Sequence, residues 1–237
     1  MIEVHVLASS SAGCCYRVTD GSTPLLVEAG IPIRRIREGV RFQMSSLAGC
    51  LVSHEHGDHA RAVRDLLRAG VDVYASSGTL RALGVELDHR ARHLAPRRQV
   101  RIGTWTVLPF EAVHDAAEPF GFLLASGDEK LLYLTDSAYC RYRFAGLTVL
   151  MIECNYSAEI LRRNVAAGRI DVARRNRVLR NHMGLERVLE LLRANDLARV
   201  REIHLLHLSD ENSDEAAFKA AVERATGKPV YVSWRGW

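Results

Sequence analysis

Short apolar runs separated by polar turn residues characterise the first half of the chain. Several of them alternate apolar and polar positions, and others are continuously apolar, as half-buried and fully buried strands are. These runs predict strands at residues 2–8, 14–18, 24–30, 47–53, 71–76, 104–110, 120–126 and 130–136. The dipeptides Asp20-Gly21 and Gly127-Asp128 are typical of hairpin turns.

Apolar residues three and four positions apart predict helices between and after these strands. The helical segments are residues 31–40, 60–70, 77–84, 157–168, 184–196 and 213–227, and two more strands are expected at 147–154 and 201–209. No internal repeat, low-complexity tract or Pro/Gly-rich linker interrupts the chain. Strands mixed with helices in both halves indicate two sheets in contact with helices on their outer faces, in one α/β domain covering residues 1–237.

Composition narrows the class of protein. The chain has 237 residues, 48% of them hydrophobic, which suffices for one substantial core. No apolar run approaches the ~20 residues that a membrane helix needs, and the first residues lack the pattern of a secretory signal. The five cysteines are odd in number and form no C-x-x-C pair. We therefore expect a cytoplasmic protein with reduced thiols and no membrane partner.

One basic segment stands out from a net charge of only +4. Residues 162–180 contain seven arginines and a single acid, Asp171. The arginines are Arg162, Arg163, Arg169, Arg174, Arg175, Arg177 and Arg180. A solvated helix face would explain such a run. Because acidic neighbours are scarce and arginine suits bidentate phosphate contacts, we favour a surface that binds the nucleic-acid backbone.

The sequence SHEHGDHA, residues 53–60, concentrates three histidines and two carboxylates directly after a predicted buried strand. In an extended segment, positions i and i+2 face the same way, so His54 and His56 can converge. Gly57 allows a sharp turn, after which Asp58 and His59 begin a helix. Asp58 could serve simply as the helix N-cap, but that role leaves the histidines unexplained. Imidazole and carboxylate groups are ligands for zinc, manganese or iron.

A site for two metal ions needs further donors at the ends of other strands. Three such residues follow predicted strands: His114, Asp136 and His207. Each alone has an ordinary explanation, as a surface or core histidine or as a turn aspartate. Together with the first cluster they predict a binuclear hydrolytic centre.

This pattern closely resembles the metallo-β-lactamase fold superfamily, whose hallmark H-x-H-x-D-H is present as His54, His56, Asp58 and His59. The resemblance implies an αββα sandwich with two divalent ions, from the set zinc, manganese and iron, at one edge. It also implies ligand roles. His54, His56 and His114 would bind one ion, Asp58, His59 and His207 the second, and Asp136 both.

The match extends over residues 2–233 to the YycJ/WalJ-like branch, which includes phage-type members and proposed exonucleases. The similar segments are LASSSAGCCYRV (7–18), VHDAAEPFGF (113–122), LTDSAY (134–139), RNHMGLE (180–186) and LHLSDENSD (206–214). Glu28 stands where the branch commonly has aspartate, and Ala12 and Cys14 where glycine and asparagine are usual. Glu28 is one methylene longer than the aspartate that is common at this position.

The expected function is therefore metal-dependent hydrolysis of a phosphodiester in nucleic acid, with the resemblance implying a DNA exonuclease of possible 5′ to 3′ direction. Asp58 would orient the attacking hydroxide, and His182 would bind phosphate or protonate the leaving oxygen. His182 can equally be a polar residue ahead of a helix. Two alternatives stay open: a glyoxalase-like thioester hydrolase of the same fold, and a non-catalytic nucleic-acid-binding protein. Asn155 is either a residue supporting the metal site or an ordinary turn asparagine.

Overall fold

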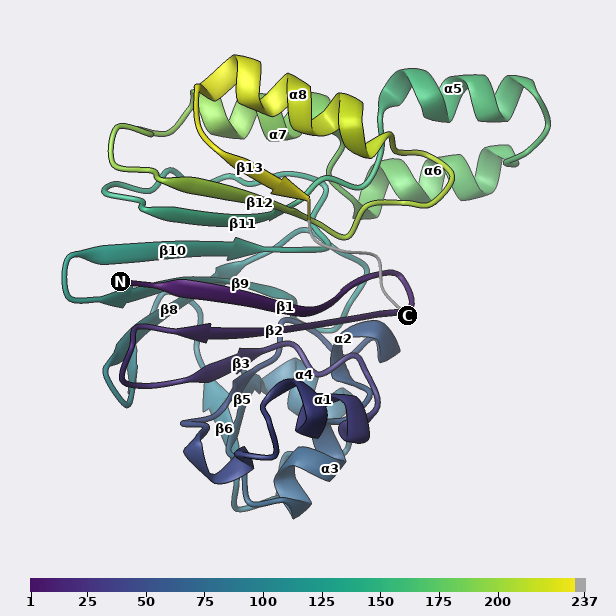
Figure 1. The fold of residues 1–237 in the computed structure, drawn as a ribbon. Coiled ribbons are helices and arrows are strands. Elements are labelled where there is room, and N and C mark those ends of the chain that lie inside the picture. The colour runs from purple at the N-terminus through teal and green to yellow at the C-terminus, as the bar shows by residue number, and fades with distance from the viewer. Residues whose placement is uncertain (233–237) are drawn as a thin grey trace. The chain divides into compact units, whose positions relative to one another are not determined.

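The structure is a computed structural model that describes residues 1–232 (Figure 1). The chain forms two compact units. Unit 1 contains Met1–Glu111 and Ala116–Lys130, and unit 2 contains Ala112–Asp115 and the described residues from Leu131 onward. The expectation of one domain over residues 1–237 remains a prediction, and its last five residues lie outside the described part of the chain.

Unit 1 is built on a six-stranded sheet whose strand order follows the sequence. The strands are β1 (Glu3–Ser10), β2 (Gly13–Thr19), β3 (Leu25–Val27), β4 (Cys50–Leu51), β5 (Val73–Ser76) and β6 (Ala91–Leu94). β1 to β3 are antiparallel, and β3 to β6 are parallel. Parallel neighbours end at the same edge of a sheet. The segments that follow β3 and β4 are therefore adjacent, and the Glu28 N–H donates to the Leu51 carbonyl at 2.8 Å.

Short helices and a small antiparallel array complete unit 1. The helices are α1 (Ile33–Gly39), η1 (Met44–Ser46, a 3-10 turn), α2 (Gly57–Ala60), α3 (Val63–Arg68) and α4 (Ser77–Ala82). Leu26, Val52 and Val73 share one buried cluster with Ile36 and Leu66. The antiparallel strands are β7 (Val100–Ile102), β8 (Trp105–Glu111) and β9 (Phe120–Ser126).

Unit 2 contains parallel strands and four helices. Its strands are β10 (Glu129–Leu134, which enters the unit at Leu131), β11 (Val149–Glu153), β12 (Glu202–Leu206) and β13 (Val230–Val232). β10 to β13 pair in parallel in that order. Every residue of β11 is buried, as expected for a parallel strand covered on both faces. The helices are α5 (Ala158–Ala166), α6 (Val172–Asn181), α7 (Leu185–Arg193) and α8 (Glu215–Thr226).

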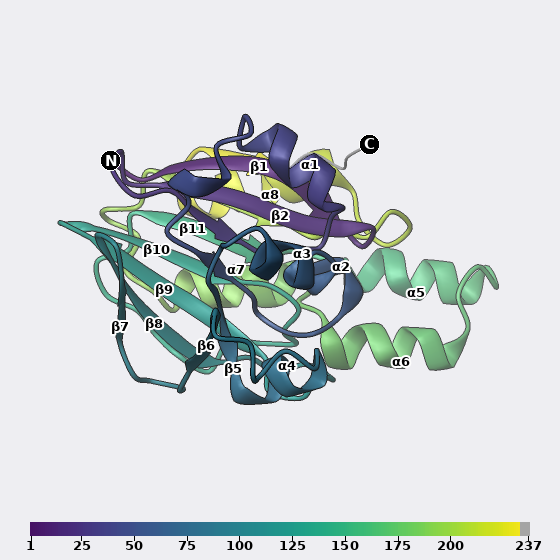
Figure 2. The same ribbon diagram turned by 90° about the horizontal axis from the view of Figure 1, so that it is seen from below.

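The pair α5 and α6 extends away from the parallel strands of unit 2, and Figures 1 and 2 agree that the two helices lie side by side. A small apolar cluster of Tyr156, Leu161 and Ile170, with Val165 and Val178 against it, holds the pair together. Asp171 caps α6 by accepting a hydrogen bond from the Arg174 N–H at 2.7 Å. The basic run is therefore mostly two short helices, with few buried side chains.

The predicted strands and helices are present, with some differences in extent. The strand expected at 47–53 is reduced to Cys50–Leu51 because the backbone turns before the histidine segment. The sequence did not predict β6, β7 and β13, which are three or four residues long and too short to show a period. All five cysteines are free thiols, four of them buried, and burial raises the pKa of the Cys15 thiol. None of the described helices is both long and apolar enough to span a membrane.

Candidate metal centre

The segment after β4 brings two imidazoles of unit 1 together. His54 is buried, and its Nδ1 lies 2.9 Å from the Ser53 hydroxyl, so its Nε2 faces the other way. This Nε2 lies 3.1 Å from Nδ1 of His56, as the i and i+2 spacing predicts. Zinc binds imidazole nitrogen at ~2.0–2.1 Å. Two nitrogens at this separation can therefore bind one ion.

Asp58 and His59 lie in the first turn of α2. The N-cap of α2 is His56, and the helix begins at Gly57, so the alternative in which Asp58 is the N-cap is wrong. Nε2 of the fully buried His59 lies 3.5 Å from an Asp58 carboxylate oxygen. Gly57 does not adopt a left-handed conformation, so the turn does not need the glycine there for its backbone freedom.

Glu28, which follows β3, lies beside His59. Its buried carboxylate accepts a hydrogen bond from the Ser53 N–H at 3.3 Å and lies 3.6 Å from His59 Nδ1. A carboxylate on one ring nitrogen commonly fixes which nitrogen of a metal-binding histidine faces the ion. The glutamate therefore reaches His59 from this position despite its extra methylene, and His59 Nε2 faces Asp58.

Gly30 allows the β3 loop to pack directly on the histidine segment, a role that the sequence pattern did not indicate. A Cβ atom at Gly30 would lie 1.7 Å from the carbonyl oxygen of Asp58. Two backbone hydrogen bonds of 2.8 Å join the β3 loop to the histidine segment and its continuation, from the Ala29 N–H to the His59 carbonyl and from the Ala62 N–H to the Ala29 carbonyl. Only glycine fits this contact.

In unit 2, three predicted donors meet at the ends of β10 and β12. His207 Nδ1 lies 2.6 Å from one carboxylate oxygen of Asp136, and His114 Nε2 lies 3.5 Å from the other. All three side chains are almost fully buried. Asn155 donates through Nδ2 to the His207 carbonyl at 2.8 Å, which supports the view that it holds the backbone of a donor residue.

Unit 2 also contains a carboxylate that sequence reasoning missed. Glu153, the last residue of β11, is fully buried and lies 2.6 Å from His182 Nδ1. It also accepts hydrogen bonds from the Met183 N–H at 3.0 Å and the Ser137 N–H at 3.2 Å. Ligand atoms of Asp136, Glu153, His182 and His207 all lie within 4.8 Å of one another. The one sequence feature that could have indicated Glu153 is the acidic residue near the end of the apolar run LTVLMIEC.

Glu153 and His182 stabilise each other's charged forms. Burial alone raises the pKa of the Glu153 carboxyl, but the adjacent His182 lowers it below its ordinary value. Burial alone lowers the pKa of His182, but the Glu153 carboxylate raises it above its ordinary value. The pair is therefore favoured as an ion pair. His114 differs, because burial lowers the pKa of its imidazole and favours the neutral form that binds metals.

The backbone is strained at two donor residues of unit 2 and at Glu28, beside His59, in unit 1. Six non-glycine residues among residues 1–232 have positive φ, and three of them are Glu28 at 67°, Asp136 at 42° and His207 at 52°. Each such conformation costs ~1–3 kcal/mol and is retained mainly at functional sites. With their buried imidazole and carboxylate groups, the donors of each unit fit a divalent metal ion.

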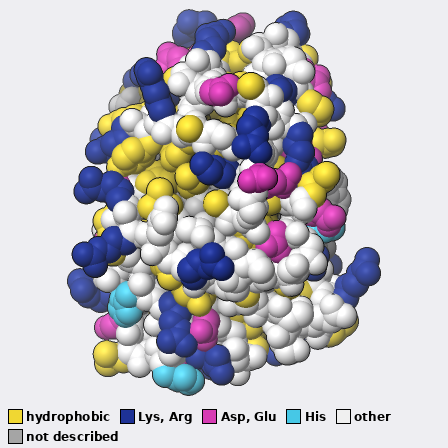
Figure 3. Space-filling model, turned by 90° about the vertical axis from the view of Figure 1, so that its left-hand side faces the viewer, with side chains coloured by type: hydrophobic (Ala, Val, Ile, Leu, Met, Phe, Trp, Pro, Cys, Tyr) yellow, Lys and Arg dark blue, Asp and Glu magenta, His cyan; other side chains and the backbone are white. Residues whose placement is uncertain are grey.

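The predicted arginine surface lies on α5, α6 and the connection between them. Arg174 pairs with Glu211 at 2.8 Å, and Arg177 approaches Asp115 at 3.7 Å. Arg169 instead donates to the Asn164 side chain. Lysine and arginine side chains also occur widely on the face drawn in Figure 3, so positive charge alone does not mark a binding surface.

A cavity of about 660 Å³ lies beside α6. Three arginines, Asn181, Asp115 and Asp171 are among the residues that line it. The arginines are Arg174, Arg177 and Arg180. The Asn181 carbonyl lies 3.0 Å from His114 Nδ1, and His182 follows as the C-cap residue of α6. The α6 arginines are thus the part of the basic run that adjoins the donors of unit 2.

Comparisons with known proteins identify the family of the chain. Residues 24–207 match the beta-lactamase superfamily domain. The chain is 30% identical to exodeoxyribonuclease WalJ of Streptococcus pneumoniae serotype 2 (strain D39), with 89% of this chain and 83% of that protein covered. Exodeoxyribonuclease YycJ of Bacillus anthracis is 28% identical over 91% of this chain and 86% of its own length.

A solved structure shows the same fold. The metallo-beta-lactamase fold protein YhfI from Bacillus subtilis has a TM-score of 0.76 and 16% identity, with 100% of this chain and 98% of that chain covered. The predicted fold and family resemblance are confirmed. This chain belongs to the beta-lactamase superfamily, has the metallo-β-lactamase fold, and falls in the branch that contains WalJ and YycJ.

Proposed function

We propose that this protein is a binuclear metal-dependent nuclease that hydrolyses phosphodiester bonds in DNA from strand ends. The observation that carries the proposal is the set of imidazole and carboxylate donors, mostly buried and close together within each unit. The name exodeoxyribonuclease on relatives that are similar along most of the chain supports DNA as the substrate. Free buried thiols support a cytoplasmic location.

The proposed ligands follow the family motif. His54, His56 and His114 bind one ion, Asp58, His59 and His207 bind the other, and Asp136 binds both. Zinc and manganese suit these donors, and iron is also compatible. When bound, two divalent ions lower the pKa of water and stabilise charge on the attacking and leaving oxygens.

Protein side chains would orient the attacking water and donate a proton to the leaving oxygen. The Asp58 carboxylate orients the attacking water by accepting its hydrogen bond, while Glu28 keeps the His59 ring in place. The Glu153 carboxylate holds the Nδ1 proton of His182, which leaves Nε2–H as the group that protonates the leaving oxygen. The raised pKa of His182 favours this protonated form. Proton delivery to the leaving oxygen is therefore its proposed role.

The basic run would position the DNA backbone without reading its sequence. All seven arginines between Arg162 and Arg180 contribute positive potential. The α6 members would make the direct phosphate contacts because their cavity adjoins His182 and His114. A thioester hydrolase would have no use for this cavity.

The test follows hydrolysis of DNA labelled at its 5′ or its 3′ end, single- and double-stranded, with added manganese or zinc. Stepwise shortening is expected, and EDTA or His56→Ala abolishes it. His89→Ala, at an exposed histidine outside the donor set, is the matched control and keeps full activity. If the metal-loaded protein shortens neither DNA nor RNA, the proposed nuclease function is wrong. The thioester hydrolase alternative would then be favoured. Chelator-resistant DNA binding without hydrolysis would favour the non-catalytic alternative.

A further inference from the structure

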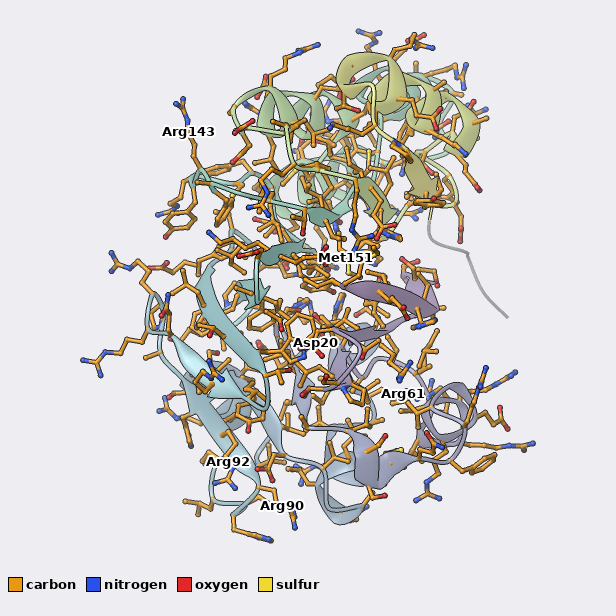
Figure 4. All side chains as sticks on the ribbon, turned by 60° about the vertical axis from the view of Figure 1, so that its left-hand side comes forward. Asp20, Arg61, Arg90, Arg92, Arg143 and Met151 are labelled. Carbon is orange, nitrogen blue, oxygen red and sulfur yellow. The ribbon has the colours of Figure 1, made fainter. Side chains whose placement is uncertain are left out.

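The segment Tyr139–Phe144 of unit 2 alternates aromatic side chains with arginines in the sequence YCRYRF. It begins three residues after Asp136, one of the proposed metal ligands. The Tyr139 residue is 45% exposed, and Arg141 and Arg143 are exposed as well. Figure 4 shows Arg143 pointing away from the ribbon. Among the carboxylates of residues 1–232, none lies within ion-pair distance of Arg141 or Arg143.

This segment has no regular secondary structure, but hydrogen bonds hold both of its ends. The Ser137 hydroxyl donates to the Tyr139 carbonyl at 2.9 Å, and the Ser137 N–H donates to Glu153. At the other end, the Phe144 N–H donates to the Asn195 side chain at 2.7 Å. The aromatic groups are therefore presented from a fixed backbone, which lowers the entropic cost of binding a ligand.

A cavity of about 480 Å³ lies between this segment and α7. Tyr139, Cys140, Arg141, Tyr142 and Arg143 line one side, and Arg187, Glu190, Leu191 and Ala194 line the other. Three of the lining residues are arginines against one glutamate, and Arg187 is paired with that glutamate at 2.7 Å. The net charge of the lining is positive, and Tyr139 contributes an exposed aromatic residue to it.

We propose that this aromatic–arginine pocket binds an unpaired stretch of the DNA strand beside the bond that is hydrolysed. Base faces stack on aromatic side chains, and arginines bind the phosphates between them. The strand must be unpaired here, because the bases of a duplex stack on one another. Three residues of chain span at most ~11 Å, so the pocket receives bases within a few nucleotides of the scissile bond. The inference rests on the proposed function and adds the substrate class, single-stranded ends.

The test makes two changes separately: it removes bases from the ends of the DNA, and it removes the side chain of Tyr139 from the protein. Fluorescence anisotropy measures the binding of labelled single-stranded oligodeoxynucleotides in EDTA, with intact ends or with three abasic nucleotides at each end. Stacking is worth ~1 kcal/mol or more per base, which is about fivefold in affinity. Abasic ends are therefore expected to weaken binding to the wild type at least fivefold, and to change binding to Tyr139→Ala by less than twofold.

Two further variants make the outcome specific. Tyr139→Trp keeps an aromatic face and is expected to retain the sensitivity to abasic ends. Tyr231→Ala, at a 51% exposed tyrosine of the same unit outside the pocket, is the matched control and should behave as wild type. Equal affinity of the wild type for intact and abasic strands would overturn the proposal, as would full abasic sensitivity in Tyr139→Ala. Either result would leave a protein partner as the occupant of the pocket.

A separate measurement keeps this inference distinct from the proposed nuclease function. Hydrolysis of bis(p-nitrophenyl) phosphate by the manganese-loaded wild type tests the metal centre without any nucleobase. If neither this diester nor DNA is cleaved, the nuclease function is wrong, and the binding experiment still decides whether the pocket takes unpaired bases. If both are cleaved but abasic strands bind normally, only the pocket assignment is wrong.

Discussion

Replacing Gly30 by alanine is predicted to damage the metal site through the backbone alone. The added Cβ would lie 1.7 Å from the Asp58 carbonyl oxygen and 2.8 Å from the Cys14 nitrogen. Ordinary contact distances require the two loops to separate by ~1.5 Å or more. Both obstructing atoms belong to the backbone, so no side-chain rotation relieves the contact.

The cost of this separation can be worked out from the contacts. Overpacking of this kind costs ~1–3 kcal/mol. Moving the loops apart also weakens the two hydrogen bonds that join them at 2.8 Å, each worth ~0.5–1.5 kcal/mol. The expected loss in the free energy of unfolding is therefore about 2–6 kcal/mol. Because Asp58 itself is displaced, metal affinity should fall as well.

Urea unfolding followed by circular dichroism measures the loss, and elemental analysis after dialysis measures the zinc content. Gly57→Ala is the matched control in the same region, because a Cβ there meets no atom within 4 Å. It should stay within ~0.5 kcal/mol of the wild type. A Gly30→Ala protein with wild-type stability and full zinc content would refute the reasoning. It would show that the two loops can accommodate a Cβ atom at this position without separating.

Other predictions address charge, catalysis and metal. The double variant Arg177→Ala, Arg180→Ala should lower the magnitude of the slope of log affinity against log salt concentration by about 2. The control Arg34→Ala, on unit 1, should leave the slope unchanged. A double variant with the wild-type slope would show that α6 does not contact the DNA phosphates. His182→Ala should reduce the DNA cleavage rate ~10²–10⁴-fold at unchanged metal content, and near-normal turnover would exclude a proton-donor role. Partial burial by itself raises the pKa of Asp20, but hydrogen bonds from hydroxyl and backbone groups outweigh it and hold the pKa below its ordinary value. The stabilising contribution of Asp20 is thus present above the unfolded pKa and lost as pH falls through the lower folded value, so Asp20→Asn should flatten acid denaturation. Zinc at 100 times its dissociation constant should raise the free energy of unfolding by ~2.7 kcal/mol, reversibly with EDTA; no thermal shift would argue against a folded-state site.

Local spacing along the chain was enough to propose most donors of the candidate site. The i and i+2 positions of His54 and His56 converge because side chains alternate along an extended backbone. His114, Asp136 and His207 were candidates because each follows an apolar run that is typical of a strand. The fold and the family branch were also predictable from motifs contiguous in the sequence, and the comparisons confirm both.

Tertiary structure alone decided the interactions between distant segments. Glu153 ends an apolar run that is typical of a buried strand, and no neighbouring residue distinguishes it from any acidic residue at the end of a strand. Its partner His182 is 29 residues away in the sequence. Gly30 matters only because parallel pairing of β3 and β4 brings its loop against Asp58. The aromatic–arginine pocket likewise forms only when α7 packs beside residues 139–143. Periodicity and spacing report the conformation of a segment, whereas the chemistry of these groups depends on which segments burial brings together.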